Sequence, residues 1–244
     1  MSATEVVFYY VLPITGCCLV LAMASSPVKA MRESEARGEL GPFNPFPPVL
    51  FLMTNLVWVI NGLLISNVFV FFINVVMVFV NGHITMRCYR MADPHRATQM
   101  ELLILVFSSI AMMFGFGFIY GEDQDSVREI FGWLCAAFNM CVFVPPMLLM
   151  QEVIQKRDAI QINAPFAVVG AINTAFWCMY GLLIPIYPLL IPNAFGCALS
   201  IVQVMLTAIF PGEGVVKGSD VTDVKITTET ELSTAIQPVY EPVV

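Results

Sequence analysis

Seven uncharged, apolar runs of about 20 residues each dominate this chain of 244 residues. A helix needs roughly 20 apolar residues to cross the hydrocarbon core of a bilayer, whereas a barrel strand needs only about ten residues of alternating polarity. An open sheet would leave unpaired backbone groups in lipid. The runs therefore predict an all-α membrane protein with seven transmembrane helices, at 6–24, 46–65, 67–86, 102–120, 130–151, 165–184 and 188–210.

The composition agrees with a membrane protein, because 58% of the residues are apolar and only 12% are charged. A net charge of −7 disfavours nucleic acid as a partner. The seven cysteines show no metal-ligand spacing, and no catalytic Ser-His-Asp set or pair of carboxylates occurs in the apolar runs. The sequence thus predicts a protein that is not an enzyme and holds no metal or cofactor.

The basic residues indicate how the helices are oriented, since Lys and Arg concentrate in cytosolic loops. Ten of the eleven fall on one side of the predicted membrane, and Arg128 is the exception. The ten are Lys29, Arg32, Arg37, Arg87, Arg90, Arg96, Lys156, Arg157, Lys217 and Lys225. We therefore expect the N-terminus outside and the C-terminus in the cytosol, with the plasma membrane as the favoured location.

The chain also contains an internal repeat at an offset of 119 residues, which relates "VWVINGLLI" at 57–65 to "FWCMYGLLI" at 176–184. The same offset pairs Trp58 with Trp177 and Asn74 with Asn193. Helices one to three and five to seven are therefore predicted to be two copies of one unit, which run parallel because one helix separates them. The expected segments are a first repeat, a linker with helix four, a second repeat and a disordered cytosolic tail, at 1–90, 91–127, 128–210 and 211–244.

The two Trp-Asn pairs are the candidate substrate site. In transporters built from such repeats, the substrate site lies at the interface between them. Both pairs fall at a depth of roughly 10 Å below the outer surface, counted along the helices. A neutral amide donates and accepts hydrogen bonds, and an indole can lie against the C–H face of a sugar ring. A neutral polyol fits this chemistry; the alternative is that the tryptophans anchor the protein at the lipid interface.

Further features concern the mechanism. The central turns of the six repeat helices contain no Asp, Glu, Lys or Arg, which favours facilitated diffusion over coupling to an ion. Prolines remove backbone hydrogen bonds and kink helices, so four of them are predicted to form bend points at an inner gate. Those four are Pro27, Pro47, Pro146 and Pro165, and the candidates for flexing the outer gate are Gly62, Gly181 and Pro192.

Several stretches between residues 10 and 210 resemble the SWEET (MtN3/saliva) family of sugar transporters. They are "SSPVKAM", "VWVINGLL", "FFINVV", "FNMCVFVPPMLLMQEVI" and "AFWCMYGLLIPIYPLLIPNAFG". The resemblance implies a bidirectional uniporter of mono- or disaccharides that works by alternating access. It also implies that Asn74 and Asn193 contact sugar, that Trp58 and Trp177 line the pocket, and that the four inner prolines are the family's tetrad. Met23 and Val142 would shape the pocket floor, and Tyr180 would belong to the outer gate.

The chain departs from this family in lacking the Asp that commonly stands shortly before the Pro-Asn pair. Two tryptophans in the pocket leave less room than one, which favours a monosaccharide such as glucose. The alternatives are a PQ-loop-type transporter of amino acids, which would carry Pro-Gln pairs where this chain has "SPV" and "PPM", and a seven-helix receptor, which would have no repeat. A homo-oligomer is compatible with the sequence, which does not fix the number of subunits.

Overall fold

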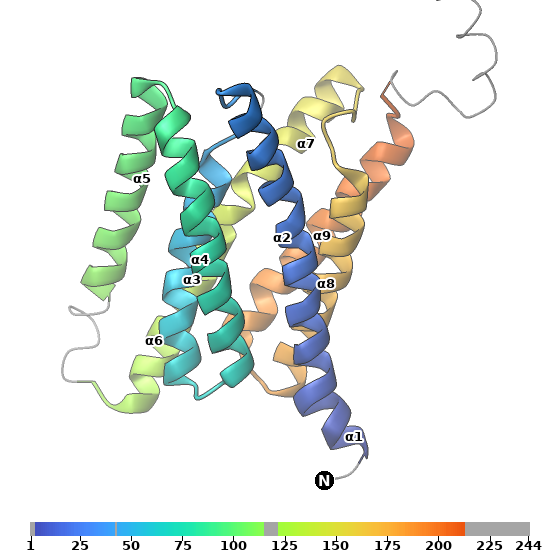
Figure 1. Cartoon of the computed structure of the whole chain (residues 1–244). Helices are drawn as coiled ribbons and strands as arrows, with labels where there is room; N and C mark the ends of the chain where they lie inside the picture. The colour runs from blue at the N-terminus through green and yellow to red at the C-terminus, as the bar shows by residue number, and fades with distance from the viewer. Residues whose placement is uncertain (1–2, 42, 115–121, 213–244) are drawn as a thin grey trace, which may run out of the picture.

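Helices form all the regular structure in the part of the chain that the computed structural model describes, residues 3–41, 43–114 and 122–212 (Figure 1). A short π-helical turn, Val7–Val11, joins the first two α-helices. The α-helices are α1 (Ala3–Val6), α2 (Leu12–Arg37), α3 (Phe46–Leu64), α4 (Val68–Met91), α5 (Pro94–Met112), α6 (Gln124–Val142), α7 (Val144–Lys156), α8 (Ala164–Leu183) and α9 (Tyr187–Ile209).

The predicted all-α membrane architecture is confirmed. Among the described residues, six helical spans are long and apolar enough to cross a membrane. The bounds of α3, α4, α8 and α9 follow the apolar runs, although α4 continues past the run's end to Met91. The fourth predicted span, 102–120, coincides with α5 as far as Met112, and its residues 115–120 lie outside the described residues.

The first predicted helix was too short. It was expected to end at residue 24, but α2 continues without a break to Arg37 with Pro27 in its interior. The apolar run marks only the part that suits lipid, whereas the polar segment after Pro27 is rich in good helix formers. The helix ends at Gly38, whose φ of 76° is the left-handed conformation that glycine adopts readily.

The fifth predicted helix is longer than the run at 130–151 and is broken in two. The α6 segment ends at Val142 and α7 begins at Val144, with Phe143 between them. Pro145 and Pro146 follow at once, and neither can donate a backbone hydrogen bond to the preceding turn. The corresponding helix of the first repeat, α2, has a single proline in its interior, Pro27, and remains continuous.

The two repeats interlock. Within each repeat, the second and third helices form a tightly packed antiparallel pair, α3 with α4 and α8 with α9. Between repeats, α2 packs on α8, and α6 packs on α3. The first helix of each unit therefore packs against the second helix of the other, which is the arrangement expected of two parallel copies, and α5 lies outside this core against α3 (Figure 1).

Two glycines allow the paired helices to approach closely. A Cβ added at Gly62 would lie 2.7 Å from the backbone N of Phe71, and one added at Gly181 would lie 3.0 Å from the backbone N of Leu190. Phe71 and Leu190 are themselves 119 residues apart, as are the two glycines. This contact gives a packing reason for the repeated glycine, which sequence reasoning had interpreted as a flexible gate position.

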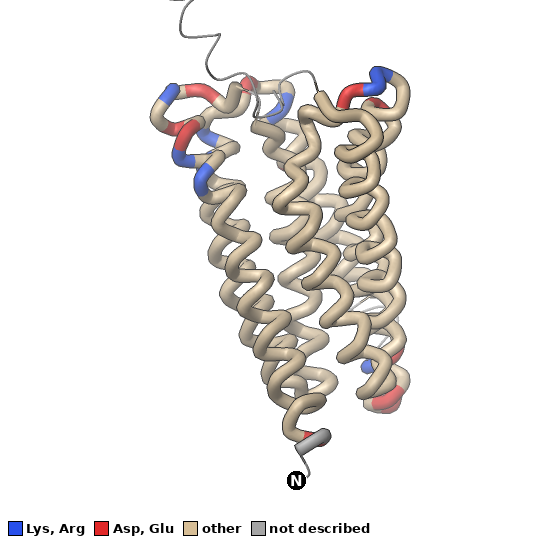
Figure 2. The backbone as a smooth tube through the Cα atoms, turned by 90° about the vertical axis from the view of Figure 1, so that its right-hand side faces the viewer, with Lys and Arg blue, Asp and Glu red and all other residues tan. Residues whose placement is uncertain are grey.

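Charged residues gather at the two ends of the bundle (Figure 2). The end that carries the N-terminus also holds the α3–α4 and α8–α9 turns, and we call it the N-terminal end. The opposite end, which we call the basic end, holds the α2–α3, α4–α5 and α7–α8 loops (Figure 1). A buried apolar cluster that includes Val57, Phe131 and Leu189 fills the interface between repeats toward the N-terminal end.

Candidate functional site

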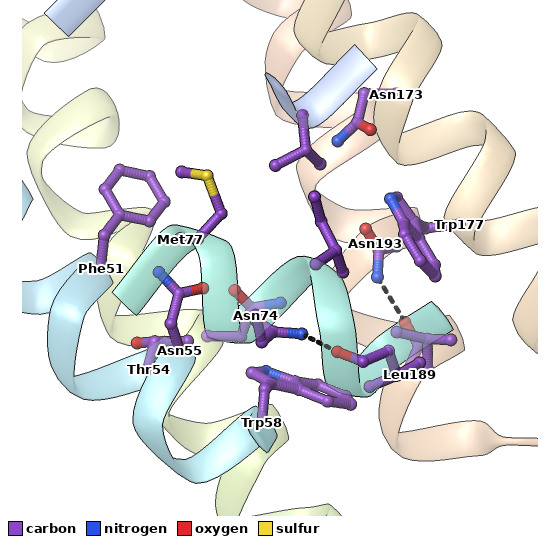
Figure 3. A pocket seen from close by; sticks show the side chains of 14 residues that line it. Phe51, Thr54, Asn55, Trp58, Asn74, Met77, Asn173, Trp177, Leu189 and Asn193 are labelled. Carbon is purple, nitrogen blue, oxygen red and sulfur yellow. Dashed lines mark hydrogen bonds between the residues drawn. The ribbon is translucent and has the colours of Figure 1, made fainter. Parts of the chain in front are cut away.

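A cavity of about 170 Å³ lies between the two repeats (Figure 3). Side chains from both units form its wall. They are Val20, Phe51, Thr54, Asn55, Trp58, Val70, Ile73, Asn74, Met77, Asn139, Asn173, Trp177, Leu189 and Asn193. Five pairs of these residues are related by the 119-residue offset: Val20 and Asn139, Thr54 and Asn173, Trp58 and Trp177, Val70 and Leu189, and Asn74 and Asn193.

The four residues singled out by the repeat meet in this cavity. Trp58 and Asn74 line it from the first repeat, and Trp177 and Asn193 line it from the second (Figure 3). Only 4% of Trp58 and 6% of Trp177 is exposed. The alternative that these indoles anchor the protein in the lipid interface is therefore wrong, because both rings are buried between the repeats.

The two amides are held in the same way in each repeat. The Nδ2 of Asn74 donates to the carbonyl of Val70 at 2.7 Å, and the Nδ2 of Asn193 donates to the carbonyl of Leu189 at 2.8 Å (Figure 3). Each bond runs one helical turn back and fixes the orientation of the side chain. Each amide keeps a carbonyl oxygen and a second N–H hydrogen, so each can still accept and donate one bond to a ligand.

Sequence reasoning missed a second group of polar side chains. Thr54, Asn55, Asn139 and Asn173 also line the cavity. Among the described residues, the Nδ2 of Asn55 and the Oδ1 of Asn173 are buried without a hydrogen-bond partner. A buried polar atom of this kind is costly unless a ligand or water satisfies it. The available signal was a polar residue inside an uncharged apolar run, at matching positions of the two copies.

Met23 and Val142 lie outside the cavity wall in this conformation. They follow Val20 and Asn139 by three residues, almost one turn nearer the basic end. Met23 instead approaches α8, where a Cβ added at Gly170 would lie 3.5 Å from its Cε. Val142 is buried at the last residue of α6, beside the helix break. The expectation that both shape the floor is not met here, because the wall ends before them.

Toward the N-terminal end, a hydrogen bond joins the repeats beside the cavity. The Nδ2 of Asn67 donates to the hydroxyl of Tyr180 at 2.8 Å. Asn67 also caps α4, since its Oδ1 accepts from the backbone N of Val70. The ring of Tyr180 stands edge-on to the indole of Trp177, with centroids 5.9 Å apart. Tyr180 therefore connects a cavity wall to the turn before α4.

The prolines do not form four equivalent bends. Pro47 and Pro165 lie in the first turns of α3 and α8, where no backbone hydrogen bond is lost, so these two do not kink their helices. Pro27 lies inside the unbroken α2, and Pro192 lies inside α9. The one break is the junction before Pro146. The expectation of four matching kinks is wrong in this conformation.

Phe143, the residue at that break, packs closely on α9. A Cβ added at Gly196 would lie 2.6 Å from its Cζ, and its ring is 5.5 Å from that of Phe195. The positions 119 residues before Phe143 and Gly196 are Ala24 and Met77, respectively. In the first repeat the larger side chain of this pair of positions is Met77, on α4. In the second repeat it is Phe143, between α6 and α7, so the two repeats are packed differently at this level.

The chemistry of the cavity is neutral. None of the fourteen residues that line it is ionisable at ordinary pH. Across residues 3–41, 43–114 and 122–212, no group of three or more His, Cys, Asp and Glu side chains could hold a metal ion. The wall offers indole faces together with amide and hydroxyl groups. This arrangement suits a small, uncharged, hydroxyl-rich molecule with one apolar face.

Comparisons with known proteins agree with this interpretation. Residues 129–214 match a family model described as "Sugar efflux transporter for intercellular exchange". The chain is similar to the bidirectional sugar transporter SWEET11 of Arabidopsis thaliana, with 24% identity over 213 residues, covering 85% of this chain and 72% of the relative. It is also similar to the sugar transporter SWEET1 of Caenorhabditis elegans, with 24% identity over 201 residues, covering 82% of this chain and 65% of that relative.

The fold matches that of a solved eukaryotic SWEET transporter, with a TM-score of 0.73 at 18% identity. The match covers 85% of this chain and 99% of the solved chain. At this identity, the likeness supports the arrangement of the helices and does not identify a substrate.

Proposed function

We propose that this chain, which belongs to the SWEET (MtN3/saliva) family, is a facilitative, bidirectional sugar uniporter that works by alternating access. The observation that carries the proposal is the convergence of two Trp-Asn pairs, one from each repeat, on one cavity without an ionisable side chain. Relatives that are named sugar transporters support the same function.

The proposed binding mode assigns separate tasks to the two kinds of side chain. The indoles of Trp58 and Trp177 stack on the apolar face of the sugar ring. Asn74 and Asn193 bond to hydroxyls through the amide atoms that their helices leave free. Asn55 and Asn173 add a buried donor and a buried acceptor nearer the basic end. A sugar would satisfy these atoms, which gives it an advantage over an apolar solute of the same size.

The substrate that we favour is a monosaccharide such as glucose. The cavity measures about 170 Å³, and two buried indoles, one from each repeat, form part of its wall. A single ring fits between two such faces, whereas a disaccharide needs space for a second ring beside the first. The missing membrane carboxylates favour transport down a gradient, since proton-coupled carriers generally keep ionisable groups in the membrane.

We further propose that the N-terminal end faces outward and the basic end faces the cytosol of the cell, with the plasma membrane as the location. The support is the positive-inside rule applied to the loops of the basic end. In this orientation the Asn67–Tyr180 bond would lie on the outer side of the cavity, and we propose that it helps to hold that side closed. Opening would require that bond to break while the basic ends of the helices come together.

The test is uptake and counterflow of labelled hexose in cells that lack their own hexose carriers, with and without a proton gradient. We expect uptake to persist when the gradient is collapsed and to be lost in Asn74→Ala and Asn193→Ala. The matched control is Asn81→Ala, which removes an amide bonded in the same way, to the carbonyl of Met77, from the same helix as Asn74 but outside the cavity. Dependence on the gradient contradicts the uniport mechanism, and uptake of cationic amino acids instead of hexose supports the PQ-loop alternative.

A further inference from the structure

We propose that Gly16 determines which sugars this protein accepts by size, because its missing side chain sets the position of the Trp177 indole. The inference rests on the proposed sugar-transport function and adds a residue that does not itself line the cavity. Gly16 lies on α2 in the first repeat, and Trp177 lies on α8 in the second.

The indole of Trp177 lies directly against the backbone of α2. A Cβ added at Gly16 would lie 3.0 Å from both Cε2 and Nε1 of Trp177, and 3.3 Å from Cζ2. Real Cβ atoms rarely approach a neighbour this closely, so the ring would have to move by some tenths of an ångström. Gly16 is buried behind the ring, because Trp177 lines the cavity and Gly16 does not.

The direction of that movement follows from the other neighbours of the ring. Tyr180 stands edge-on to the indole at 84°, and its hydroxyl accepts a hydrogen bond from Asn67. Both Trp177 and Tyr180 belong to the buried cluster between the repeats, and protein interiors of this kind are close-packed. A ring displaced from α2 therefore moves toward the cavity and narrows it.

The residue equivalent to Gly16 in the other repeat is not a glycine. The position 119 residues after Gly16 is Cys135, which has no exposed surface and lies in the same buried cluster as Trp58. Only the Trp177 wall therefore lies against a residue without a side chain. Gly16 therefore acts on the wall that the second repeat contributes, and the residue at the equivalent position does not act in this way on the wall of the first.

A cavity of about 170 Å³ leaves little tolerance, so a small shift of one wall discriminates between sugars that differ by a methyl group. The experiment measures KM in proteoliposomes for glucose and for 3-O-methylglucose, which differs from glucose only by a methyl group on one hydroxyl. In Gly16→Ala, we expect the ratio of the second KM to the first to rise by about tenfold, the lower end of the range that one methylene produces in a tight pocket. Wild-type uptake of both sugars serves as the test of the proposed function itself.

Two variants separate a specific effect from a general loss of stability. Gly82→Ala is the matched control, since its added Cβ meets only a Leu52 methyl at an ordinary 3.7 Å, and it should leave the ratio unchanged. Trp177→Phe replaces the indole with a smaller ring, so adding Gly16→Ala to that variant should no longer change the ratio. If Gly16→Ala alone does not fold, folding of the double variant supports the proposed contact, and failure of both overturns it.

An unchanged ratio in folded Gly16→Ala overturns the inference, as does an equal loss for both sugars. If wild-type protein carries neither sugar, the proposed function fails instead. The contact is then tested without sugar through the emission of Trp177 alone, in protein with Trp58→Phe and Trp133→Phe, which removes the other two of the three tryptophans. A spectrum that Gly16→Ala leaves unshifted shows that the indole did not move.

Discussion

The Nδ2 of Asn67 donates to the hydroxyl of Tyr180 across the two repeats at 2.8 Å, beside the cavity and toward the N-terminal end. This bond has no counterpart in the other half, because the positions related by 119 residues are Ile186 and Asn61. The chain lacks the Asp that commonly stands before the Pro-Asn pair in the SWEET family, which it resembles. Asn67 and Tyr180 instead form an uncharged bond between the repeats near this end of the bundle.

Breaking this bond should favour the state that is open toward the N-terminal end. Tyr180→Phe removes the hydroxyl and keeps the ring packed on Trp177, while Asn67→Ser keeps a residue that can cap α4 and removes the amide donor. An interhelical hydrogen bond in a membrane contributes roughly 0.6 kcal/mol, so each variant should lower the KM for external sugar about threefold. The measurement is uptake kinetics in cells.

The double variant provides the control for that experiment. If Asn67 and Tyr180 act through one bond, the two changes together should have no more effect than either alone. Additive effects would contradict a direct interaction.

Asn139 should contribute one hydrogen bond to the sugar. Its equivalent in the first repeat is Val20, and both residues line the cavity. Asn139→Val makes the two walls alike and removes an amide while approximately preserving its volume. A net hydrogen bond is worth about 0.5–1.5 kcal/mol, which corresponds to an increase in KM of about two- to tenfold. An unchanged KM in counterflow assays would show that Asn139 does not touch the substrate.

Transport should be independent of pH between about 5.5 and 8, because no cavity side chain titrates in that range. The helix caps should not introduce a dependence either. Backbone N–H donation, chiefly from Arg96, lowers the pKa of Asp93, and donation chiefly from Ser126 lowers the pKa of Asp123. A carboxyl group whose pKa is lower in the folded than in the unfolded protein stabilises the fold at any pH above its unfolded pKa. That contribution is lost as pH falls through the folded pKa, which lies below this range of pH.

Exchange of labelled glucose at equal pH on both sides, repeated across the range, tests this expectation. Asn74→Asp provides the contrast, since it introduces a titratable group into the cavity and should make exchange depend on pH. A pronounced optimum in the wild-type protein would indicate an ionisable group outside the cavity wall.

Gly62 should tolerate substitution less well than Gly181. A Cβ at Gly62 would lie 2.7 and 2.8 Å from backbone atoms of Phe71, whereas a Cβ at Gly181 would lie 3.0 and 3.2 Å from backbone atoms of Leu190. Backbone cannot rotate away as a side chain can, so Gly62→Ala should destabilise the protein by about 1–3 kcal/mol or more. Thermal unfolding in detergent should give the lowest midpoint for Gly62→Ala, an intermediate one for Gly181→Ala, and the wild-type value for Gly82→Ala.

The sequence predicted the helices and the central residues well because lipid imposes a simple rule on composition. Each helix must be apolar over a bilayer's thickness, and the repeat identifies which polar exceptions matter. The repeat does not say why a residue recurs, however. Asn44 and Asn163 are also 119 residues apart, and both lie outside the cavity wall. Asn163 caps α8 by accepting from the backbone N of Phe166, whereas Asn44 precedes the first residue of α3 and accepts from the backbone N of Phe46.

Other features were not predictable because they depend on how one repeat packs against the other. The sequence shows Asn173 as a polar residue in an apolar run, but its place in the cavity wall depends on the packing of α8 against the other repeat. Gly16 shows no repeat signal, since its counterpart is Cys135, and its importance comes only from the ring it meets. The four prolines looked equivalent in sequence, but their effect depends on where each helix begins, which apolar runs do not define.

The interruption at Phe143 gives the two halves different mechanical characters. α2 is one continuous helix through Arg37. The equivalent helix of the second repeat is interrupted between α6 and α7 at Phe143, which packs on Gly196. An interrupted helix bends more easily than a continuous one, so we expect the second half to move more than the first when the cavity changes the side to which it opens. Binding of sugar from one side and its release on the other would then not be symmetrical steps, even though one cavity serves both.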